Sequence, residues 1–520
     1  MTLKRPEVLI FFIIYLLFSF PPFGISEPGL YAEGIKGAID HTRSSDPEIK
    51  TAADALAHYI MGSVYDNFGV TEKAVVEYKE TLQEEKNVAE VYLKLGADLM
   101  LLNRLDEAEE VLEKASAVDP ENTRSHLLLA IIHTAKGEYN KAATQHEEAL
   151  KYDPENLNTL AFLSDLFVAQ RKLGKAAEVY EKILRIRDDD AFLYFNLGII
   201  YSKLDLLDKA EEKFIKAIEV DENYLEAQIV LGFIYEVDKR YNKAIEQYKR
   251  VIEIDPNNKE AYIRLTQIYN KQGQFEKAEK ENEKLLKIYP ISVEPYLNGF
   301  SIYLHQKEYK KAENVINEAL KKGLTDASLY AGLGYLYSLD DEHQKAIKVY
   351  RQAVLADDEN DMYKFYLASS LDQIGETEKA IAILKSITKG SDGLPEAYNY
   401  LGYLYAESGK DLDEAIILIK KALKLDPDNG AYIDSLGWTY YKKGETKKAL
   451  QEIKKAVKYL PNDPIIAEHF GDIYFAKGSE RKALRQWKRA LKADPDNKRI
   501  EKKIERSKKN KKTSKKERGI

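Results

Sequence analysis

Residues 231–256, LGFIYEVDKRYNKAIEQYKRVIEIDP, hold the pattern that decides the fold. Gly232 follows a leucine, Tyr235 comes three residues later, Ala244 lies twelve residues after Gly232, and Pro256 closes the stretch. Apolar residues spaced three and four apart lie on one face of a helix, and proline disfavours helix in the residue before it. The stretch therefore predicts two successive helices with a turn between them.

The pattern recurs along most of the chain on a period of 34 residues. Alanine marks the period at Ala74, Ala108, Ala142, Ala176, Ala210, Ala244, Ala278, Ala312, Ala346 and Ala380, and, after one inserted residue, at Ala415, Ala449 and Ala483. A fixed period of this length means that one supersecondary unit is stacked on itself many times. We count thirteen copies over residues 55–497 and expect an all-α solenoid, a fold that mostly serves binding.

The order Leu-Gly-x-x-Tyr, then Ala, then Pro at this period resembles the tetratricopeptide repeat (TPR). The resemblance implies antiparallel helix pairs wound into a right-handed superhelix, with a concave groove lined mainly by the first helix of each pair. The copies near residues 157, 293 and 361 fit least well, because the closing proline is missing and Phe300 replaces a small residue. The motif is specific for the fold and says almost nothing about the ligand.

From the ninth copy onward, many aromatic residues lie on the face of each first helix that turns away from the core. We predict that this face binds protein or peptide segments through Tyr335, Phe365, Tyr366, Asn399, Tyr400, Tyr403, Asp434, Ser435, Trp438 and Tyr441. A contiguous aromatic patch usually marks a contact site. The alternative is that these aromatic residues belong to the core, with Trp438 packed between adjacent repeats. Earlier copies carry a mixed set on this face, including Gln267, Asn270, Lys271 and Asn298.

The last three copies are similar to a group of exported bacterial TPR proteins, through residues 431–444, residues 468–474 and Trp487. Many of that group are outer-membrane lipoproteins, and some are adaptors that present substrates to a C-terminal-processing protease. This chain departs from the group because it has no cysteine to accept a lipid. It also lacks the Lys, Asn and Arg trio on consecutive groove faces with which another TPR subfamily binds the C-terminal carboxylates of chaperones.

The N-terminus resembles a secretory signal. Lys4 and Arg5 precede a mostly apolar run over residues 8–20 that is shorter than a membrane span, and Ser26 offers a cleavage point. We expect residues 1–26 to be a signal peptide, or alternatively an uncleaved anchor. Residues 27–54 would then be a linker or N-terminal cap, and the protein would lie in the bacterial periplasm or envelope. The absence of cysteine fits export without disulfides.

The C-terminus, residues 498–520, is strongly basic. Twelve Lys or Arg residues against three Glu give this segment a charge of +9 while the whole chain carries −7, so the remainder carries −16. Because binding to phosphates needs clustered positive charge, the acidic body argues against nucleic acid as a ligand of the groove, and we expect none. We expect a capping helix over residues 498–506 and no fixed structure from Lys508 on. The tail either contacts an anionic membrane surface or is a solvated segment.

No catalytic motif is present, and the repeats leave no room for a separate catalytic domain. We expect no enzyme activity and no cofactor. One copy holds His126, His133 and His146, which would suit a metal ion if they met on facing helices; the alternative is that they replace ordinary core or rim residues. The chain is therefore predicted to be an exported, non-enzymatic scaffold or adaptor. The second candidate is an inner-membrane-anchored assembly factor for envelope or polysaccharide machinery.

Overall fold

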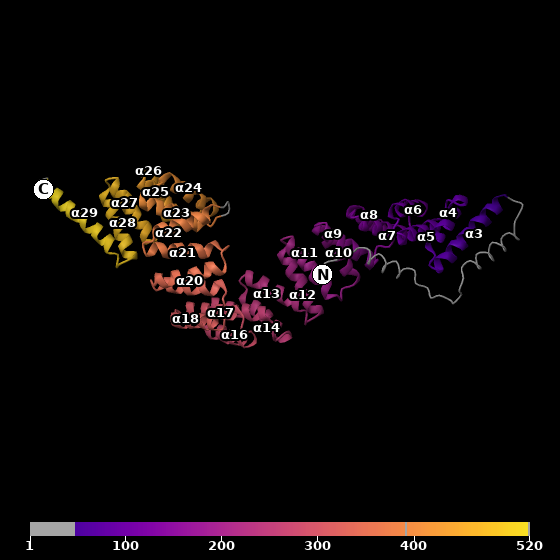
Figure 1. Cartoon of the computed structure of the whole chain (residues 1–520), viewed down its shortest axis with the longest axis horizontal. Coiled ribbons are helices and arrows are strands. Elements are labelled where there is room, and N and C mark those ends of the chain that lie inside the picture. The colour runs from indigo at the N-terminus through magenta and orange to yellow at the C-terminus, as the bar shows by residue number, and fades with distance from the viewer. Residues whose placement is uncertain (1–46, 390–392, 518–520) are drawn as a thin grey trace. The chain divides into compact units, whose positions relative to one another are not determined.

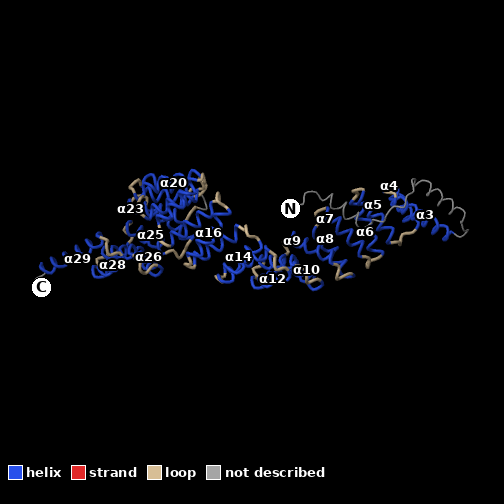
Figure 2. The backbone as a smooth tube through the Cα atoms, turned by 90° about the horizontal axis from the view of Figure 1, so that it is seen from below, coloured by secondary structure: helices blue, strands red, loops and turns tan. Residues whose placement is uncertain are grey.

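Every regular element in residues 47–389 and 393–517, which the computed structural model describes, is an α-helix (Figures 1 and 2). This confirms the predicted all-α class. The predicted signal segment, residues 1–26, and most of the predicted linker lie outside the described residues. No helix in the described ranges is long and apolar enough to cross a membrane.

The helices fall into two compact units, Met1–Pro256 and Asn257–Ile520. Unit 1 contains α3 (Pro47–Asn67), α4 (Thr71–Glu84), α5 (Ala89–Leu101), α6 (Leu105–Val118), α7 (Thr123–Ala135), α8 (Tyr139–Tyr152), α9 (Leu157–Ala169), α10 (Leu173–Ile186), α11 (Ala191–Lys203), α12 (Leu207–Val220), α13 (Leu225–Val237) and α14 (Tyr241–Ile254). Unit 2 contains α15 (Lys259–Lys271), α16 (Phe275–Ile288), α17 (Val293–His305), α18 (Tyr309–Lys321), α19 (Ala327–Leu339), α20 (His343–Ala356), α21 (Asp361–Gln373), α22 (Thr377–Thr388), α23 (Pro395–Ser408), α24 (Leu412–Leu425), α25 (Gly430–Lys442), α26 (Thr446–Tyr459), α27 (Pro464–Ala476), α28 (Glu480–Ala493) and α29 (Lys498–Glu517).

Helices α3 to α28 form thirteen consecutive pairs in the described part of the chain, which confirms the predicted number of repeats. The helices of each pair pack against each other, and within each unit successive pairs pack together. Helix α3 begins at Pro47, ahead of the predicted boundary at residue 55. The end of the predicted linker over residues 27–54 therefore belongs to the first repeat.

The ends of the helices follow from local chemistry. The side chain of Asn429 accepts hydrogen bonds from the backbone N–H groups of Ala431 and Tyr432 and so caps α25. Such a cap satisfies donors that have no partner within the helix. At the other end, α6 stops at Val118, two residues before Pro120, as the proline signal predicts.

A residue with positive φ follows each first helix, also on the 34-residue period. Along the chain these residues are Gly69, Asn103, Gly137, Arg171, Asp205, Lys239, Gly273, Lys307, Asp341, Gly375, Gly409, Gly444 and Gly478. Only glycine takes this conformation without a steric cost from Cβ. The turn is therefore fixed by the repeat geometry even where the sequence offers no glycine.

In several repeats the small residue twelve positions before the periodic alanine makes room for one large side chain of the second helix in the same pair. A Cβ built on Gly96 would lie 2.5 Å from Cγ of Leu112, and one on Gly232 would lie 2.9 Å from the ring of Tyr248. Leu112 and Tyr248 are fully buried. A small residue on the first helix is therefore matched by a large, buried side chain on the second helix.

Helix α29 follows the last pair as a capping helix. Ile500 and Ile504 are buried against Trp487 and Ala490 of α28, so the first turns of α29 cover the end of the last pair. The expectation that structure ends near Lys508 is wrong, since the backbone of α29 is helical through Glu517. Lysine and glutamate are good helix formers, and the helix continues from a buried first turn.

Candidate functional site

One group of the predicted groove residues forms an aromatic ladder across α20, α21 and α23. The ring of Phe365 lies 5.9 Å from that of Tyr366 and 5.9 Å from that of Tyr400, and Tyr366 stacks on Tyr350 of α20 at 5.6 Å. Phe365, Tyr366 and Tyr400 are half-buried, and Tyr335 of α19 is 44% exposed. The rings of Phe365, Tyr366 and Tyr400 also pack against the buried core of these helices, so only part of each ring is accessible.

A hydrogen bond orients the last ring of the ladder. The Tyr400 hydroxyl donates to the carboxylate of Asp372 on α21 at 2.8 Å. Burial and this hydrogen bond, together with the negative charge of the carboxylate, raise the pKa of Tyr400 above its ordinary value of 10. The hydroxyl therefore remains a neutral donor throughout the physiological range.

The structure places Trp438 differently from the ladder. Its ring is 8% exposed and stacks on the imidazole of His469 in α27, with centroids 3.9 Å apart, and its Nε1 donates to Glu407 of α23. Tyr441, half-buried, lies 5.0 Å away. Trp438 thus packs between neighbouring repeats, which is the alternative that the sequence left open for it.

The polar residues predicted beside Trp438 also lie in the seams between helices. Asp434 is buried, with one carboxylate oxygen 2.8 Å from Nδ1 of His469 and the other without a partner. The hydroxyl of Ser435 is engaged with the backbone carbonyl of Ala431. Asn399 is half-buried, and its Oδ1 has no partner. Ser435 is thus satisfied within its own helix, whereas Asp434 and Asn399 retain acceptors.

Charged residues join α27 to the capping helix α29, and the sequence pattern does not predict these contacts. Glu468 of α27 is 2% exposed and accepts hydrogen bonds from Arg499 at 2.7 Å and Lys503 at 2.6 Å, both from α29. Burial opposes ionisation of Glu468, but these two cations outweigh it and lower its pKa. Tyr403 faces the same region, and burial together with the charges of Glu407 and Asp434 raises its pKa to about 12.

A cavity of about 710 Å³ lies between α15 and α17, two neighbouring first helices of unit 2. Its lining includes Asn270, Asn298 and Ser301, with Lys271 and His305 among the exposed residues. We call it the amide pocket. Four of its lining residues, Gln267, Asn270, Lys271 and Asn298, belong to the mixed set on the predicted groove face. Polar residues at helical spacing do not reveal that they enclose a cavity.

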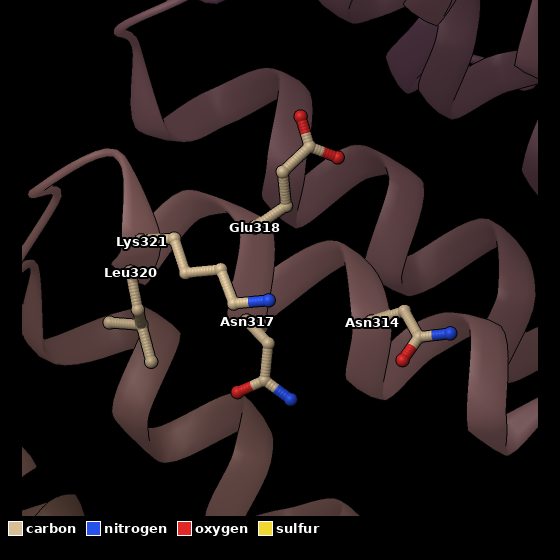
Figure 3. Close-up of a pocket in the computed structure, with 5 residues that line it drawn as sticks. All are labelled: Asn314, Asn317, Glu318, Leu320 and Lys321. Carbon is tan, nitrogen blue, oxygen red and sulfur yellow. The ribbon is translucent and has the colours of Figure 1, made fainter.

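A second hollow, of about 530 Å³, lies on α18 and is lined by side chains of that helix alone (Figure 3). Figure 3 shows Glu318 pointing away from Asn317 and Leu320. Glu318 pairs with Lys322 at 2.8 Å, and Asn314 is exposed. Because its polar groups do not converge, this hollow is an ordinary stretch of helix surface.

The three histidines of the third repeat do not share a ligand position, since each has its own surroundings. His126 bonds to Gln145 at 2.8 Å, His133 to Glu138 at 2.9 Å, and the unpaired His146 stacks on Phe162. This arrangement agrees with the alternative interpretation of the sequence, in which the three histidines replace ordinary core or rim residues.

His133 does lie within reach of two carboxylates. Together with Glu109 and Glu138 it presents three ligand atoms within 4.8 Å of one another. Lys136 pairs with Glu109 at 2.5 Å, and Lys141 pairs with Glu138 at 3.0 Å. Ammonium groups therefore already balance both carboxylates, and the cluster forms an ion-pair network beside the buried His133.

Family models decide the classification. Models described as tetratricopeptide repeat match residues 69–132, 133–198, 193–224, 238–291, 327–360, 395–429 and 435–498, together more than half of the chain. The chain belongs to the tetratricopeptide repeat family. TPR proteins are in general non-enzymatic scaffolds for protein–protein interaction, and this chain has their architecture.

Individual relatives are more distant. A TPR repeat-containing protein of Pseudomonas aeruginosa is 34% identical over 107 residues, which are 20% of this chain and 17% of that protein. The crystal structure of the APC/C hetero-tetramer Cut9–Hcn1 is similar at 17% identity and a TM-score of 0.43, over 92% of both chains. A TPR protein from Parabacteroides merdae is similar at 18% identity and a TM-score of 0.37, over 54% of this chain and 98% of that one. At these scores, neither structure identifies a partner for this chain.

Proposed function

We propose that this TPR protein is an exported scaffold that binds extended segments of partner proteins along the first helices of unit 2. The aromatic ladder carries the proposal. Phe365, Tyr366 and Tyr400 form a chain of ring contacts and are half-buried, and exposed Tyr335 lies on the preceding first helix. Aromatic residues fixed in this way bury a large area on binding and lose little conformational freedom, which is typical of anchors at interfaces.

Tyr403 is the residue at which the proposal is best tested. It lies half-buried on α23, the helix that also carries Tyr400. A photoreactive amino acid at position 403 should crosslink a protein partner in native membranes or periplasm, and the same amino acid at exposed Lys420 on the second helix α24 is the control. Equal crosslinking at both positions, or crosslinking at Lys420 alone, would move the binding surface elsewhere.

Export is the second part of the proposal. The basic start and short apolar run within residues 1–26 support it, and the mature protein should then begin near Glu27. N-terminal sequencing of the protein from its native host tests this. An intact Met1 on a protein recovered in the membrane would favour the anchored assembly factor, and an intact Met1 on a soluble cytoplasmic protein would refute export.

Recruitment of an envelope protease and contact with a membrane surface are finer proposals. The first is supported by the similarity of the last repeats to exported adaptors, and the second by the charge of +9 near the C-terminus. Each basic residue near an anionic surface contributes about 1 kcal/mol at low salt. If liposomes of anionic lipid bind the chain equally well after removal of residues 507–520, the tail has no membrane role.

A further inference from the structure

Two rows of lysines cross the second helices α24, α26 and α28. The rows occupy the positions five and nine residues after the periodic alanine in each of the last three repeats. The first row is Lys420, Lys454 and Lys488, and the second row is Lys424, Lys458 and Lys492. All six side chains are exposed. The two lysines of each helix are four residues apart and therefore lie on one face of it. We call these six residues the basic face.

Shared neighbours hold the three helices together. Helix α25 packs against both α24 and α26, and α27 packs against both α26 and α28. The guanidinium of Arg489 on α28 also donates to the backbone carbonyl of Pro461, which follows α26. Because the six lysines occupy equivalent positions in successive repeats, their side chains leave the helices on the same side.

The fold has little use for these charges. In the described part of the chain, none of the six ammonium groups pairs with a carboxylate, whereas Lys448 and Lys455 of α26 pair with Glu445 and Glu452. The second row lies in the last turn of each helix, where a cation complements the helix dipole. The first row lies one turn earlier, and like charges four residues apart on a helix are destabilising. The first row therefore adds repulsion that no contact within the chain offsets.

The pattern is confined to the C-terminal part of the solenoid. From α4 to α20, no second helix carries basic residues at both positions; α6, for example, has Glu113 and Ala117 there. The chain outside residues 498–520 carries −16, so the basic face stands against the charge of the rest of the body. A local concentration of positive charge attracts an anionic surface.

Exposed apolar side chains lie beside these lysines. Ile417 lies three residues before Lys420, on the same face of α24, and is 57% exposed. Leu425, which follows Lys424, is 54% exposed. Basic residues combined with exposed apolar side chains are typical of helices that lie on an anionic bilayer. A soluble polyanion would contact the charges but leave the apolar side chains in water.

We infer that the basic face binds the surface of a bilayer that contains anionic phospholipids, with Ile417 in contact with the headgroup region. The inference rests on the proposed membrane contact and deepens it, because it places the contact on folded helices in addition to the tail. It uses second helices, whereas the residues proposed to bind protein lie on first helices. Since the partner is a lipid, position 420 remains a control for the capture of protein.

Sedimentation of the full chain with vesicles tests the inference. Vesicles of phosphatidylcholine alone measure binding that does not depend on charge, including that of the apolar run over residues 8–20. Vesicles that also contain phosphatidylglycerol measure the part that depends on charge. Lys454→Glu combined with Lys488→Glu should weaken binding to the anionic vesicles by about tenfold or more and leave binding to the neutral vesicles unchanged. Unchanged binding to the anionic vesicles overturns the inference.

The double variant should fold, because each substitution places a glutamate four residues before a lysine, an arrangement that stabilises a helix. Lys249→Glu combined with Lys321→Glu is the matched control. Both lysines are exposed, form no ion pair within the described residues, and occupy the same two positions of α14 and α18 (Figure 3 shows Lys321). The control changes the net charge equally and should leave binding unchanged. An equal loss of binding in both double variants would implicate net charge alone and overturn the inference.

Ile417→Gln separates a bilayer from a soluble polyanion. It should weaken binding to the anionic vesicles severalfold and leave binding to polyglutamate unchanged. Unchanged binding to the vesicles counts against a bilayer as the partner. Tighter binding of polyglutamate or duplex DNA than of anionic vesicles, at equal concentration of negative charge, would assign the face to another polyanion and overturn the inference.

Two further measurements keep the proposals apart. If removal of residues 507–520 alone abolishes binding to anionic vesicles, the membrane contact belongs to the tail and the basic face fails. If crosslinking at position 403 persists while charge reversal at positions 454 and 488 has no effect on vesicle binding, the basic face fails and the proposed scaffold function stands.

Discussion

At the scale of single residues, His146 shows how burial makes stability depend on pH. It occupies the position where other repeats place the large residue of the second helix, and it stacks on Phe162 with Nδ1 unpaired. Burial lowers its pKa from 6.5 to about 4. The neutral imidazole therefore stabilises the fold fully above pH 6.5, and this contribution is lost as the pH falls toward 4.

His146→Phe should remove that loss because a phenyl ring keeps the stacking without a proton to bind. When the pH falls from 7 to 4, the free energy of unfolding of the variant should rise by about 2–3 kcal/mol relative to that of the parent. Each pKa unit corresponds to about 1.4 kcal/mol. Urea unfolding at both pH values measures this. An equal effect of the substitution at pH 7 and pH 4 would contradict the titration argument.

Trp438 is the residue at which a binding role and a structural role are best separated. Because its ring stacks on His469 and its Nε1 bonds to Glu407, Trp438→Ala should cost about 3–5 kcal/mol of stability. Trp438→Phe keeps an aromatic ring and should cost about 1 kcal/mol for the lost hydrogen bond. Folded Trp438→Phe should crosslink normally at position 403. A stable Trp438→Ala chain that fails to bind would instead make Trp438 an anchor.

At the scale of helices, replacing glycine with alanine should have opposite effects on stability inside and outside the contact between two paired helices. Gly96→Ala places a Cβ 2.5 Å from Leu112 and should destabilise by about 1–3 kcal/mol through overpacking. Gly174 lies near the start of α10, is exposed, and has no atom within 4 Å of a built Cβ. Gly174→Ala should therefore stabilise by about 0.5 kcal/mol. A denaturant midpoint below that of the parent for Gly96→Ala, and above it for Gly174→Ala, would confirm that the packing around each glycine decides the effect.

Much of the helical architecture could be predicted because period and turn chemistry are local. The alanine period gave the thirteen pairs, and prolines such as Pro120 gave the helix ends. Positive φ at Arg171 or Lys239 could not be read from residue type, because the repeat imposes that conformation on residues that do not favour it. At these positions the geometry of the helix pair determines the backbone conformation more strongly than the residue type does.

The candidate site was less predictable, because the period shows which face of a helix a residue occupies but not how far the next helix covers it. That is why Trp438 is buried and Tyr335 is exposed, although both belong to the predicted groove face. The contacts of Glu468 with Arg499 and Lys503 join residues about one repeat apart. Only the packed structure brings such partners together.

At the scale of the whole molecule, cooperativity should be limited to neighbouring repeats. The substantial contacts between helices in the described residues join helices that are one or two apart in sequence order. In such a solenoid, stability is approximately the sum of repeat and nearest-neighbour contributions. A lesion in one unit should therefore open its own neighbours first and leave distant repeats protected.

Gly334→Ala tests this in unit 2, because a Cβ at residue 334 would clash with the buried ring of Tyr350. Hydrogen exchange followed by mass spectrometry should show faster exchange in α17 to α22 and unchanged protection in α3 to α8. Gly96→Ala is the reciprocal control, since its lesion lies in unit 1. Faster exchange spread evenly over both units in either variant would mean that the chain unfolds as one cooperative body, and that the aromatic ladder and the amide pocket do not open independently of unit 1.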